Sequence, residues 1–361
     1  MGKPLQGFGL DQASRPWWLT LLVLVVASVG LYLRPNPGPK SIVLEGATMG
    51  TSYRVVVAKP SVPASRIKSV VQARLDRVVT LMSTYEPESE LSRFNASRAS
   101  EPWPVAPETR AVLEIALEVW RRSEGVFDVT VGPLVDRWGF GPSGRAKAVP
   151  SEEELNELLR QVGSDGLALT KAGLSKRHPN AEVDLSAVAK GYAVDLVSDA
   201  LDEVGVTGYL VEVGGEVRTR GEKQAGVSYR VAIEAPDAEA RRVHAVLDLK
   251  DAALATSGNY RNYIVRDGVK YAHALDPRTG RPVEHRLLSA SVLHDSCGWA
   301  DAWATALMVA GERAWSLAEA NGLEVLLLYS GPEGSLEEKV TPGFDALRRA
   351  LEQGPNSGKQ I

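Results

Sequence analysis

An alanine-rich stretch near the C-terminal end of the chain places two hard oxygen donors on one predicted helical face. Asp301 and Thr305 are four residues apart in the run from Ala300 to Leu307, so a helix points both side chains the same way. A buried carboxylate is costly unless it is paired or bound to a cation, and Mg²⁺ prefers oxygen ligands that it shares with phosphate. One interpretation of the pattern is therefore a magnesium site. The alternative is that Asp301 caps the helix start and Thr305 bonds back to a carbonyl one turn earlier.

A second cluster, from Glu182 to Tyr192, runs from a short extended stretch into a helix. The start of a helix can hold a phosphate or carboxylate, because its free N–H groups and its dipole favour negative charge. Lys190 would add positive charge there. The plainer alternative is that Asp184 or Ser186 caps the helix and that Lys190 is a solvated surface residue.

A histidine and an arginine flank the turn predicted at Asp276–Pro277. The imidazole of His273 titrates near neutral pH and can act as a general base, while Arg278 can pair with phosphate. A purely structural role for His273 remains the alternative. The Gly214–Gly215 pair, which ends an apolar strand, permits either the close approach of a ligand to the backbone or a hairpin turn.

Two aromatic side chains, Tyr85 and Phe127, can stack on a flat heterocycle or fill the core. The overall composition supports a folded protein, since 44% of the 361 residues are hydrophobic and 24% are charged. The net charge of −4 excludes the basic electrostatics typical of nucleic-acid binders. The single cysteine, Cys297, excludes an intramolecular disulfide and a cysteine-rich metal site.

The N-terminal part of the chain predicts a membrane anchor. After a short tail, residues 1–15, the segment 16–33 carries no charge, and as a helix it would span roughly 27 Å, enough for a hydrocarbon core. The Trp17–Trp18 pair suits a membrane interface, and a cleaved signal peptide is the alternative. Three prolines in residues 34–40 indicate a stiff linker. The folded domain is expected over residues 41–353 and a flexible tail over residues 354–361.

The elements that must position the candidate residues follow from periodicity and capping signals. A helix that contains Ile67 to Met82, a second over Pro107–Ser123 and a third after the capping box of Ser151 and Glu154 are expected. Further strands are expected at Ser41–Leu44, Ser52–Val57, Gly208–Val213, Tyr229–Ile233, Val243–Leu249, Tyr260–Val265, Leu287–Leu293 and Leu323–Tyr329, and further helices at Ala187–Val204, Ala300–Val309 and Arg313–Asn321. Strands mostly follow strands, so the fold class is α+β, with mixed or antiparallel sheets and interspersed helices.

Taken together, these segments resemble the ApbE family of FAD:protein FMN transferases in the order of that family's motifs. The matching stretches between Gly46 and Gly311 are Gly46–Thr51, Ser83–Tyr85, Gly125–Pro133, Val183–Asp195, Gly214–Glu216, Thr256–Arg261, His273–Gly280 and Ala300–Ala306. The resemblance implies a T-fold-related α+β domain and FAD as the donor. It also implies a requirement for Mg²⁺, and attachment of FMN through its phosphate to a threonine or serine of a partner protein, with AMP released.

The resemblance also assigns roles to residues. Asp301 and Thr305 match the side-chain metal ligands, and Ala187 matches the residue that completes the metal site, through its carbonyl. His273 matches the proposed catalytic base for the acceptor hydroxyl. The positions that match FAD contacts are Met49, Tyr85, Val126, Phe127, Asp128, Asp184, Lys190 and Leu275.

The partners that the resemblance implies are acceptor proteins with FMN-binding domains in membrane redox complexes of the NqrC/RnfG or NosR type. Those acceptors lie on the outer face of the bacterial inner membrane, so a single N-terminal anchor and a periplasmic catalytic domain are expected. Two alternatives stay open: a Mg²⁺-dependent FAD pyrophosphatase that gives FMN and AMP, and a non-catalytic FAD-binding or electron-transfer protein.

Overall fold

The computed structural model describes residues 41–98, 101–144, 148–237, 242–259, 263–266 and 268–348. The predicted tail, anchor and linker of residues 1–40 and the C-terminal tail lie outside these residues. Within the described ranges, no helix is both long enough and apolar enough to cross a bilayer.

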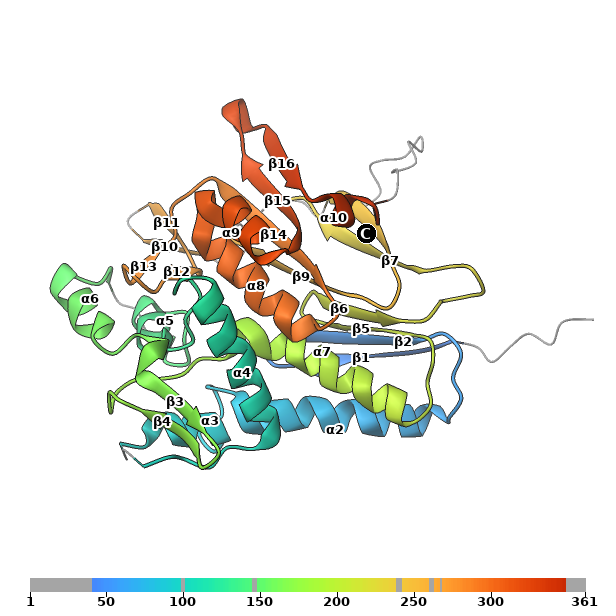
Figure 1. Ribbon diagram of the computed structural model, residues 1–361, viewed down its shortest axis with the longest axis horizontal. Coiled ribbons are helices and arrows are strands. Elements are labelled where there is room, and N and C mark those ends of the chain that lie inside the picture. Colours follow the sequence, from blue (N-terminus) through green and yellow to red (C-terminus); the bar gives the residue numbers. More distant parts are fainter. Residues whose placement is uncertain are drawn as a thin grey trace, which may run out of the picture. The chain divides into compact units, whose positions relative to one another are not determined.

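A large antiparallel sheet organises the domain (Figure 1). Eight described strands follow one another across it in the order β1-β2-β5-β6-β9-β14-β15-β16, and each neighbouring pair is antiparallel. Their bounds are β1 (Ile42–Thr48), β2 (Thr51–Val57), β5 (Tyr209–Val213), β6 (Glu216–Arg220), β9 (Ala253–Gly258), β14 (Leu287–His294), β15 (Glu324–Ser330) and β16 (Leu336–Val340). The α+β class is therefore confirmed, with a main sheet that is antiparallel rather than mixed.

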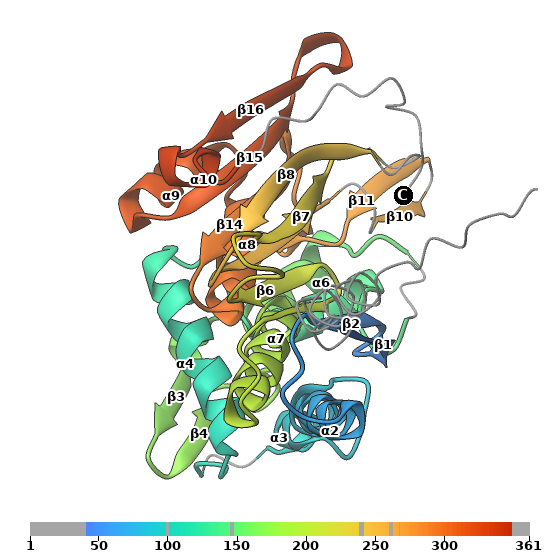
Figure 2. The same cartoon turned by 90° about the vertical axis from the view of Figure 1, so that its right-hand side faces the viewer.

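The middle strands of this sheet are buried on both faces. Along β15, Val325 and Leu327 join the core cluster on one face, while Leu326 and Leu328 join the cluster on the other. Successive side chains of a strand point to opposite faces, so a continuous apolar run is what a strand covered on both sides requires. The helices α2 (Ala64–Met82), α7 (Ser186–Glu203) and α8 (Cys297–Ala310) belong to the first cluster, and the hairpin of β7 (Tyr229–Glu234) and β8 (Val243–Leu249) with α10 (Pro342–Asp345) covers the second (Figure 2).

Several predicted elements match the structure closely. The helix that buries Ile67 and its periodic partners is α2, the second is α4 (Pro107–Arg122), and the capping box of Ser151 and Glu154 opens α6 (Glu152–Leu159). The predicted helix at Arg313–Asn321 is α9 (Ala314–Asn321). The helix predicted from Ala300 begins at Cys297 instead, because the Ser296 hydroxyl accepts a hydrogen bond from the Trp299 N–H and caps it there.

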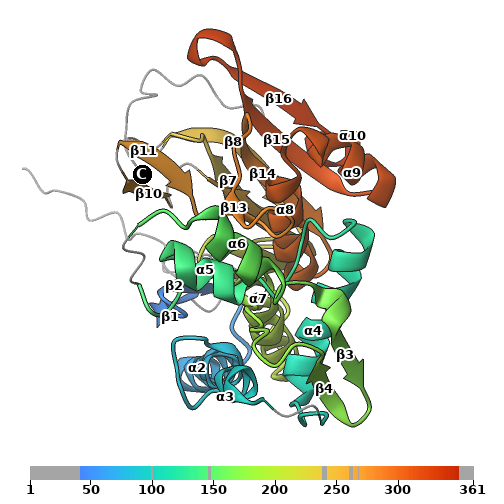
Figure 3. The ribbon, with the colours of Figure 1, turned by 90° about the vertical axis from the view of Figure 1, so that its left-hand side faces the viewer.

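A smaller group of elements packs beside the main sheet around a third apolar cluster (Figure 3). It joins Leu134 and Trp138 of α5 (Gly132–Trp138), Leu155 of α6 and Leu275 of β12 (Leu275–Asp276). The remaining elements are α3 (Glu90–Ala96), α5 (Gly132–Trp138), η1 (Ser164–Gly166), β3 (Leu167–Thr170), β4 (Gly173–Lys176), β10 (Tyr263–Arg266), β11 (Val269–Ala272), β12 (Leu275–Asp276), β13 (Arg281–Pro282), η2 (Gly311–Arg313) and η3 (Pro332–Gly334). This cluster fixes the segment that carries His273, which lies between β11 and β12.

Candidate active site

The candidate site forms where α7 and α8 cross. Gly191 of α7 lies against α8 so closely that a Cβ atom there would be 2.3 Å from the Cys297 carbonyl oxygen and 2.8 Å from the Asp301 Cβ. The glycine therefore permits the close approach of the two helices. Its N–H donates a 3.0 Å hydrogen bond to Oδ2 of Asp301, whose side chain is buried. Asp301 thus lies inside α8 and does not cap the helix start.

A second carboxylate fixes the start of α8. Asp195 of α7 accepts hydrogen bonds from the N–H groups of Cys297 and Gly298, at 3.0 and 2.9 Å, and from the Ser296 hydroxyl at 2.7 Å. It also accepts one from Arg218 at 2.7 Å. The negative charge at this helix N-terminus is favourable. These hydrogen bonds hold α8, which carries Asp301, against α7.

Lys190 connects Asp301 to a third buried carboxylate, Glu216, at the first position of β6. The Lys190 ammonium donates to Oε1 of Glu216 at 2.9 Å and lies 3.5 Å from Oδ1 of Asp301. Burial lowers the pKa of Lys190, but the charges of Asp301 and Glu216 outweigh this effect and raise the pKa above the usual lysine value. Lys190 is therefore an ion-paired residue of the site, and the solvated alternative is wrong.

Glu216 ends the matching stretch Gly214–Glu216, but neither the spacing nor the resemblance assigns it a role. Its side chain is 5% exposed, and its Oε2 atom has no hydrogen-bond partner among the described residues. The pKa of Glu216 is raised to about 7, because burial and the nearby charge of Asp301 raise it more than Lys190 lowers it. The signal that could have found it is the Gly214–Gly215 pair, which brings the start of β6 next to Lys190.

The turn between β1 and β2 also reaches this place. Met49 and Gly50 both have positive φ angles, 50° and 72°, as a two-residue hairpin turn requires. A Cβ on Gly214 would be 2.9 Å from Cγ2 of Thr51 and 3.3 Å from Cδ of Lys190. The two turns and Lys190 are therefore in contact, and Gly214–Gly215 is a hairpin turn between β5 and β6; the reading as a point of close approach to a ligand stays a prediction.

The metal-ligand candidates fit a magnesium ion by the chemistry of their donors. Thr305 is partly buried one turn after Asp301, and its hydroxyl makes no hydrogen bond to any residue that the structure describes, so it does not bond back to the helix. Ala187 lies in the first turn of α7 and is also partly buried. No group of three or more His, Cys, Asp or Glu side chains in the described ranges could hold a metal. A carboxylate, a hydroxyl and a carbonyl, with further positions left for phosphate and water, is a set that suits Mg²⁺.

Residues 127–130 lie against the segment that precedes α7. The Asp184 N–H donates to the Val129 carbonyl at 2.7 Å, and the Asp184 carboxylate accepts from the Ser186 N–H at 2.8 Å. The N-cap position of α7 is Leu185 and has no side-chain cap, so the plainer reading of Asp184 or Ser186 as the cap is wrong. Asp184 instead supports the turn that leads into the helix. The Asp128 carboxylate is occupied within the protein, where it accepts from Thr130 and from both donors of Ser164.

The residues predicted to contact FAD differ in how deeply their side chains are buried. Val126, Phe127 and Leu275 are buried in the apolar clusters, so Phe127 fills core. Met49 is partly buried against the first cluster. Tyr85, in contrast, is 63% exposed, and it is the predicted aromatic whose ring is available for stacking.

Tyr85 and His273 flank one residue, Phe140. The Tyr85 hydroxyl donates to the Phe140 carbonyl at 3.2 Å, and the Phe140 ring meets the His273 ring edge-on, with centroids 6.4 Å apart. Burial and the nearby charge of Asp184 raise the pKa of Tyr85. Arg278 makes a two-pronged ion pair with Asp276 at 2.9 and 2.7 Å, so its guanidinium is already paired.

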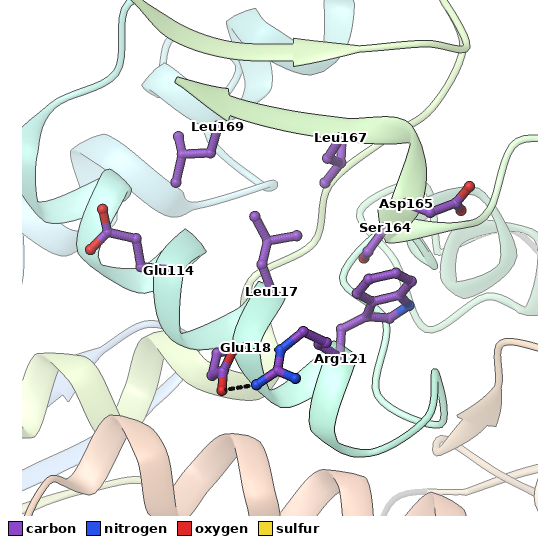
Figure 4. Close-up of a pocket in the computed structure, with 9 residues that line it drawn as sticks. Glu114, Leu117, Glu118, Arg121, Ser164, Asp165, Leu167 and Leu169 are labelled. Atoms are coloured by element: carbon purple, nitrogen blue, oxygen red, sulfur yellow. Dashed lines mark hydrogen bonds and ion pairs between the residues drawn. The ribbon is translucent and has the colours of Figure 1, made fainter. Parts of the chain in front are cut away.

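A shallow pocket elsewhere is lined by none of the predicted site residues (Figure 4). Leu117 of α4 faces Leu167 and Leu169 of β3 across it, and the Glu118–Arg121 ion pair lies on the helix at its side. Its connection to the candidate site runs through Ser164, which lines the pocket and donates to Asp128.

Comparisons with known proteins identify the family of this chain. A model of the ApbE family matches residues 49–327. A curated relative from Vibrio cholerae, named FAD:protein FMN transferase, is 42% identical over 323 residues, which cover 89% of this chain and 96% of that protein. A relative of the same name from Escherichia coli K12 is 38% identical over 341 residues, or 91% of this chain and 96% of that one.

Solved structures give the same result. The flavin transferase ApbE from Vibrio cholerae superposes with a TM-score of 0.79 at 41% identity and covers 85% of this chain and 99% of its own. The apo flavinyl transferase ApbE from Pseudomonas stutzeri gives a TM-score of 0.78 at 37% identity, covering 85% of this chain and 96% of its own. The expected membership is confirmed: this chain belongs to the ApbE family.

Proposed function

We propose that this chain is a Mg²⁺-dependent FAD:protein FMN transferase that joins FMN to a threonine or serine of an acceptor protein and releases AMP. The relatives that carry the transferase name match this chain over nearly their whole length. The single observation in the structure that supports the chemistry is the buried Asp301 carboxylate at the α7–α8 crossing, which accepts from the Gly191 N–H and which Lys190 links to the buried Glu216.

The proposed reaction exchanges one phosphoester link for another. The acceptor oxygen forms a bond to the phosphorus of the FMN half, and the bond from that phosphorus to the bridging oxygen breaks, so that AMP leaves with that oxygen. A hydroxyl is a weak nucleophile until it loses its proton, and a well-placed base contributes about 10²–10⁴-fold. We assign the proton to His273, which lies between β11 and β12 with Phe140 against its ring.

Asp301, Thr305 and the Ala187 carbonyl are the groups that would hold Mg²⁺ in this proposal. A bound divalent ion neutralises the negative charge that gathers on a reacting pyrophosphate. The chain's own contribution is to keep the Asp301 carboxylate in place through the Gly191 N–H and the Asp195 cap on α8.

The flavin end of FAD is proposed to lie near Tyr85, whose exposed ring can stack on the isoalloxazine. Phe127, Val126 and Leu275 are buried, so we propose that they contact FAD through their backbone. The Asp128 carboxylate is used internally, and its contact with FAD is assigned to the backbone for the same reason. Met49, Asp184 and Lys190 complete the proposed FAD site.

The acceptors are proposed to be FMN-binding domains of membrane redox complexes on the outer face of the inner membrane. The resemblance to the family supplies the acceptors and the side of the membrane, and the uncharged segment 16–33 with the proline-rich linker 34–40 would tether the domain there.

The test is intact-mass spectrometry of a purified acceptor domain after incubation with the full chain, FAD and Mg²⁺, beside a sample with EDTA. We expect the acceptor to gain the mass of one FMN less one water and one AMP to be released per acceptor. Both changes disappear with EDTA. A mass gain that EDTA leaves unchanged would contradict the metal requirement. Free FMN and AMP without a mass gain would instead identify a pyrophosphatase, and intact FAD would leave only a binding protein.

A further inference from the structure

Lys190, Glu216 and Asp301 form one charged group, and only Asp301 of the three is an assigned metal ligand. Two buried carboxylates, from β6 and α8, share one ammonium from α7. Each side chain comes from a different element, and α7, α8 and β6 pack on one another. With both acids ionised, this group carries one net negative charge, and a buried net charge is costly without a compensating partner.

The ammonium is not shared equally. Lys190 lies 2.9 Å from Oε1 of Glu216 and 3.5 Å from Oδ1 of Asp301. The second oxygen of Asp301 already accepts from the Gly191 N–H. Oδ1 is therefore the Asp301 oxygen that faces the lysine, and it is the one that a cation would have to share with it.

We propose that Glu216 is a positioning residue for the metal site: it holds the Lys190 ammonium back from Oδ1 of Asp301 and keeps the site negative enough to take a divalent cation. This inference rests on the proposed metal dependence and adds a residue to it. Without the Glu216 charge, Lys190 and Asp301 would neutralise each other, and the ammonium would compete directly with the cation for Oδ1.

The local structure supports a dedicated position for Glu216. The Gly214–Gly215 turn brings β6 against Lys190, and a Cβ on Gly214 would be 3.3 Å from the lysine Cδ. The Glu216 side chain is 5% exposed and its Oε2 has no hydrogen-bond partner among the described residues. A buried, unpartnered carboxylate oxygen is unusual for a residue that only stabilises a fold.

The test measures metal affinity without turnover. Mn²⁺ serves as the probe, because its free concentration is read by electron paramagnetic resonance, and Mg²⁺ is then titrated in competition. The full chain is studied at pH 8 without FAD, unaltered and with Glu216→Gln, Lys190→Met, or both. Glu212→Gln is the matched control, since Glu212 lies at the same turn and accepts from the Gly215 N–H but does not contact Lys190.

We expect Glu216→Gln to weaken Mg²⁺ binding about 10- to 100-fold, the usual cost of removing a group that supports a metal ligand. Lys190→Met should tighten binding, because it removes the competing ammonium. The double variant should bind like Lys190→Met, and Glu212→Gln like the unaltered chain. This pattern separates positioning from a structural role, which would not be rescued by removing the lysine.

Two results would overturn the inference. One is an unchanged affinity in Glu216→Gln. The other is a loss of affinity that persists fully in the Lys190→Met background, which would make Glu216 a direct ligand or a structural residue.

If Glu216→Gln does not fold, Lys190→Met alone decides, and unchanged or weaker metal binding by that variant contradicts the proposed competition between the ammonium and the cation. If the unaltered chain binds neither metal, the proposed metal site fails with the inference, whereas FMN transfer to an acceptor in EDTA would still report the transferase.

Discussion

Replacing Gly191 with alanine is the most direct test of how the site is assembled. The added Cβ would be 2.3 Å from the Cys297 carbonyl oxygen, and ordinary contacts begin near 3.4 Å. The atom it meets is backbone at the start of α8, so no side chain can move aside. We expect α7 and α8 to separate locally by about 1 Å, the difference between these two distances, and Asp301 to move away from residue 191.

The size of the effect follows from opposing contributions. Overpacking in a closed interior costs typically about 1–3 kcal/mol, and a backbone clash this short belongs at the upper end. Weakening the hydrogen bond from the residue 191 N–H to the Asp301 carboxylate costs about a further 1 kcal/mol. Alanine in a helix is better than glycine by about 1 kcal/mol. The net expectation is a loss of about 3 kcal/mol in the free energy of unfolding.

Urea unfolding followed by far-UV circular dichroism measures this loss. Gly298→Ala is the matched control, because Gly298 lies at the same crossing, on α8, but its added Cβ would meet its nearest neighbours at 3.4 Å. We expect the control to be neutral or slightly stabilising. A Gly191→Ala variant as stable as the control, with unchanged FMN transfer, would refute the close crossing as the basis of the site.

Three further predictions follow from the same structure. Asp195→Asn should lower the free energy of unfolding by about 2–4 kcal/mol in urea titrations, because an amide cannot accept all four hydrogen bonds that end on this charged side chain; a change below about 0.5 kcal/mol would speak against the cap. His273→Ala should slow FMN transfer about 10²–10⁴-fold while FAD affinity, read by fluorescence titration, is retained; normal transfer would exclude the base. Burial lowers the pKa of His294 below its ordinary 6.5. At pH values between the folded-state pKa and 6.5 the unfolded chain therefore binds more protons than the folded chain, and the free energy of unfolding falls as the pH drops below 6.5. His294→Asn, which keeps an acceptor for the Ser296 N–H, should flatten that part of the stability curve, and an unchanged slope would contradict the assignment.

Periodic and capped elements were predictable because their signals are local. The buried stripe of α2 and the Ser151–Glu154 box of α6 depend only on residues within one helix, and their positions were predicted nearly to the residue. The strands β6 and β9 were missed. Residues 216–220 read Glu-Val-Arg-Thr-Arg, which lacks an apolar alternation, and this segment is a strand because its neighbours β5 and β9 pair with it.

The candidate site was predictable in its carboxylate and hydroxyl but not in its charge balance. Spacing placed Asp301 and Thr305 on one face of α8. It could not place Lys190 between Asp301 and Glu216, because those three residues come from three elements far apart in the sequence. The solvated reading of Lys190 failed for this reason, and Glu216 gained its meaning only when the sheet brought it next to the helix crossing.

The central claim is that FMN transfer depends on the Asp301 carboxylate at the α7–α8 crossing. The measurement that tests it most directly is the mass gain of an acceptor domain incubated with FAD, Mg²⁺ and the Asp301→Ala variant, once near-UV circular dichroism shows that the variant is folded. Asp199→Ala, which removes a 62% exposed carboxylate from α7, is the control. We predict no FMN on the acceptor with Asp301→Ala and a normal gain with the control. Near-normal transfer by a folded Asp301→Ala variant would contradict the account.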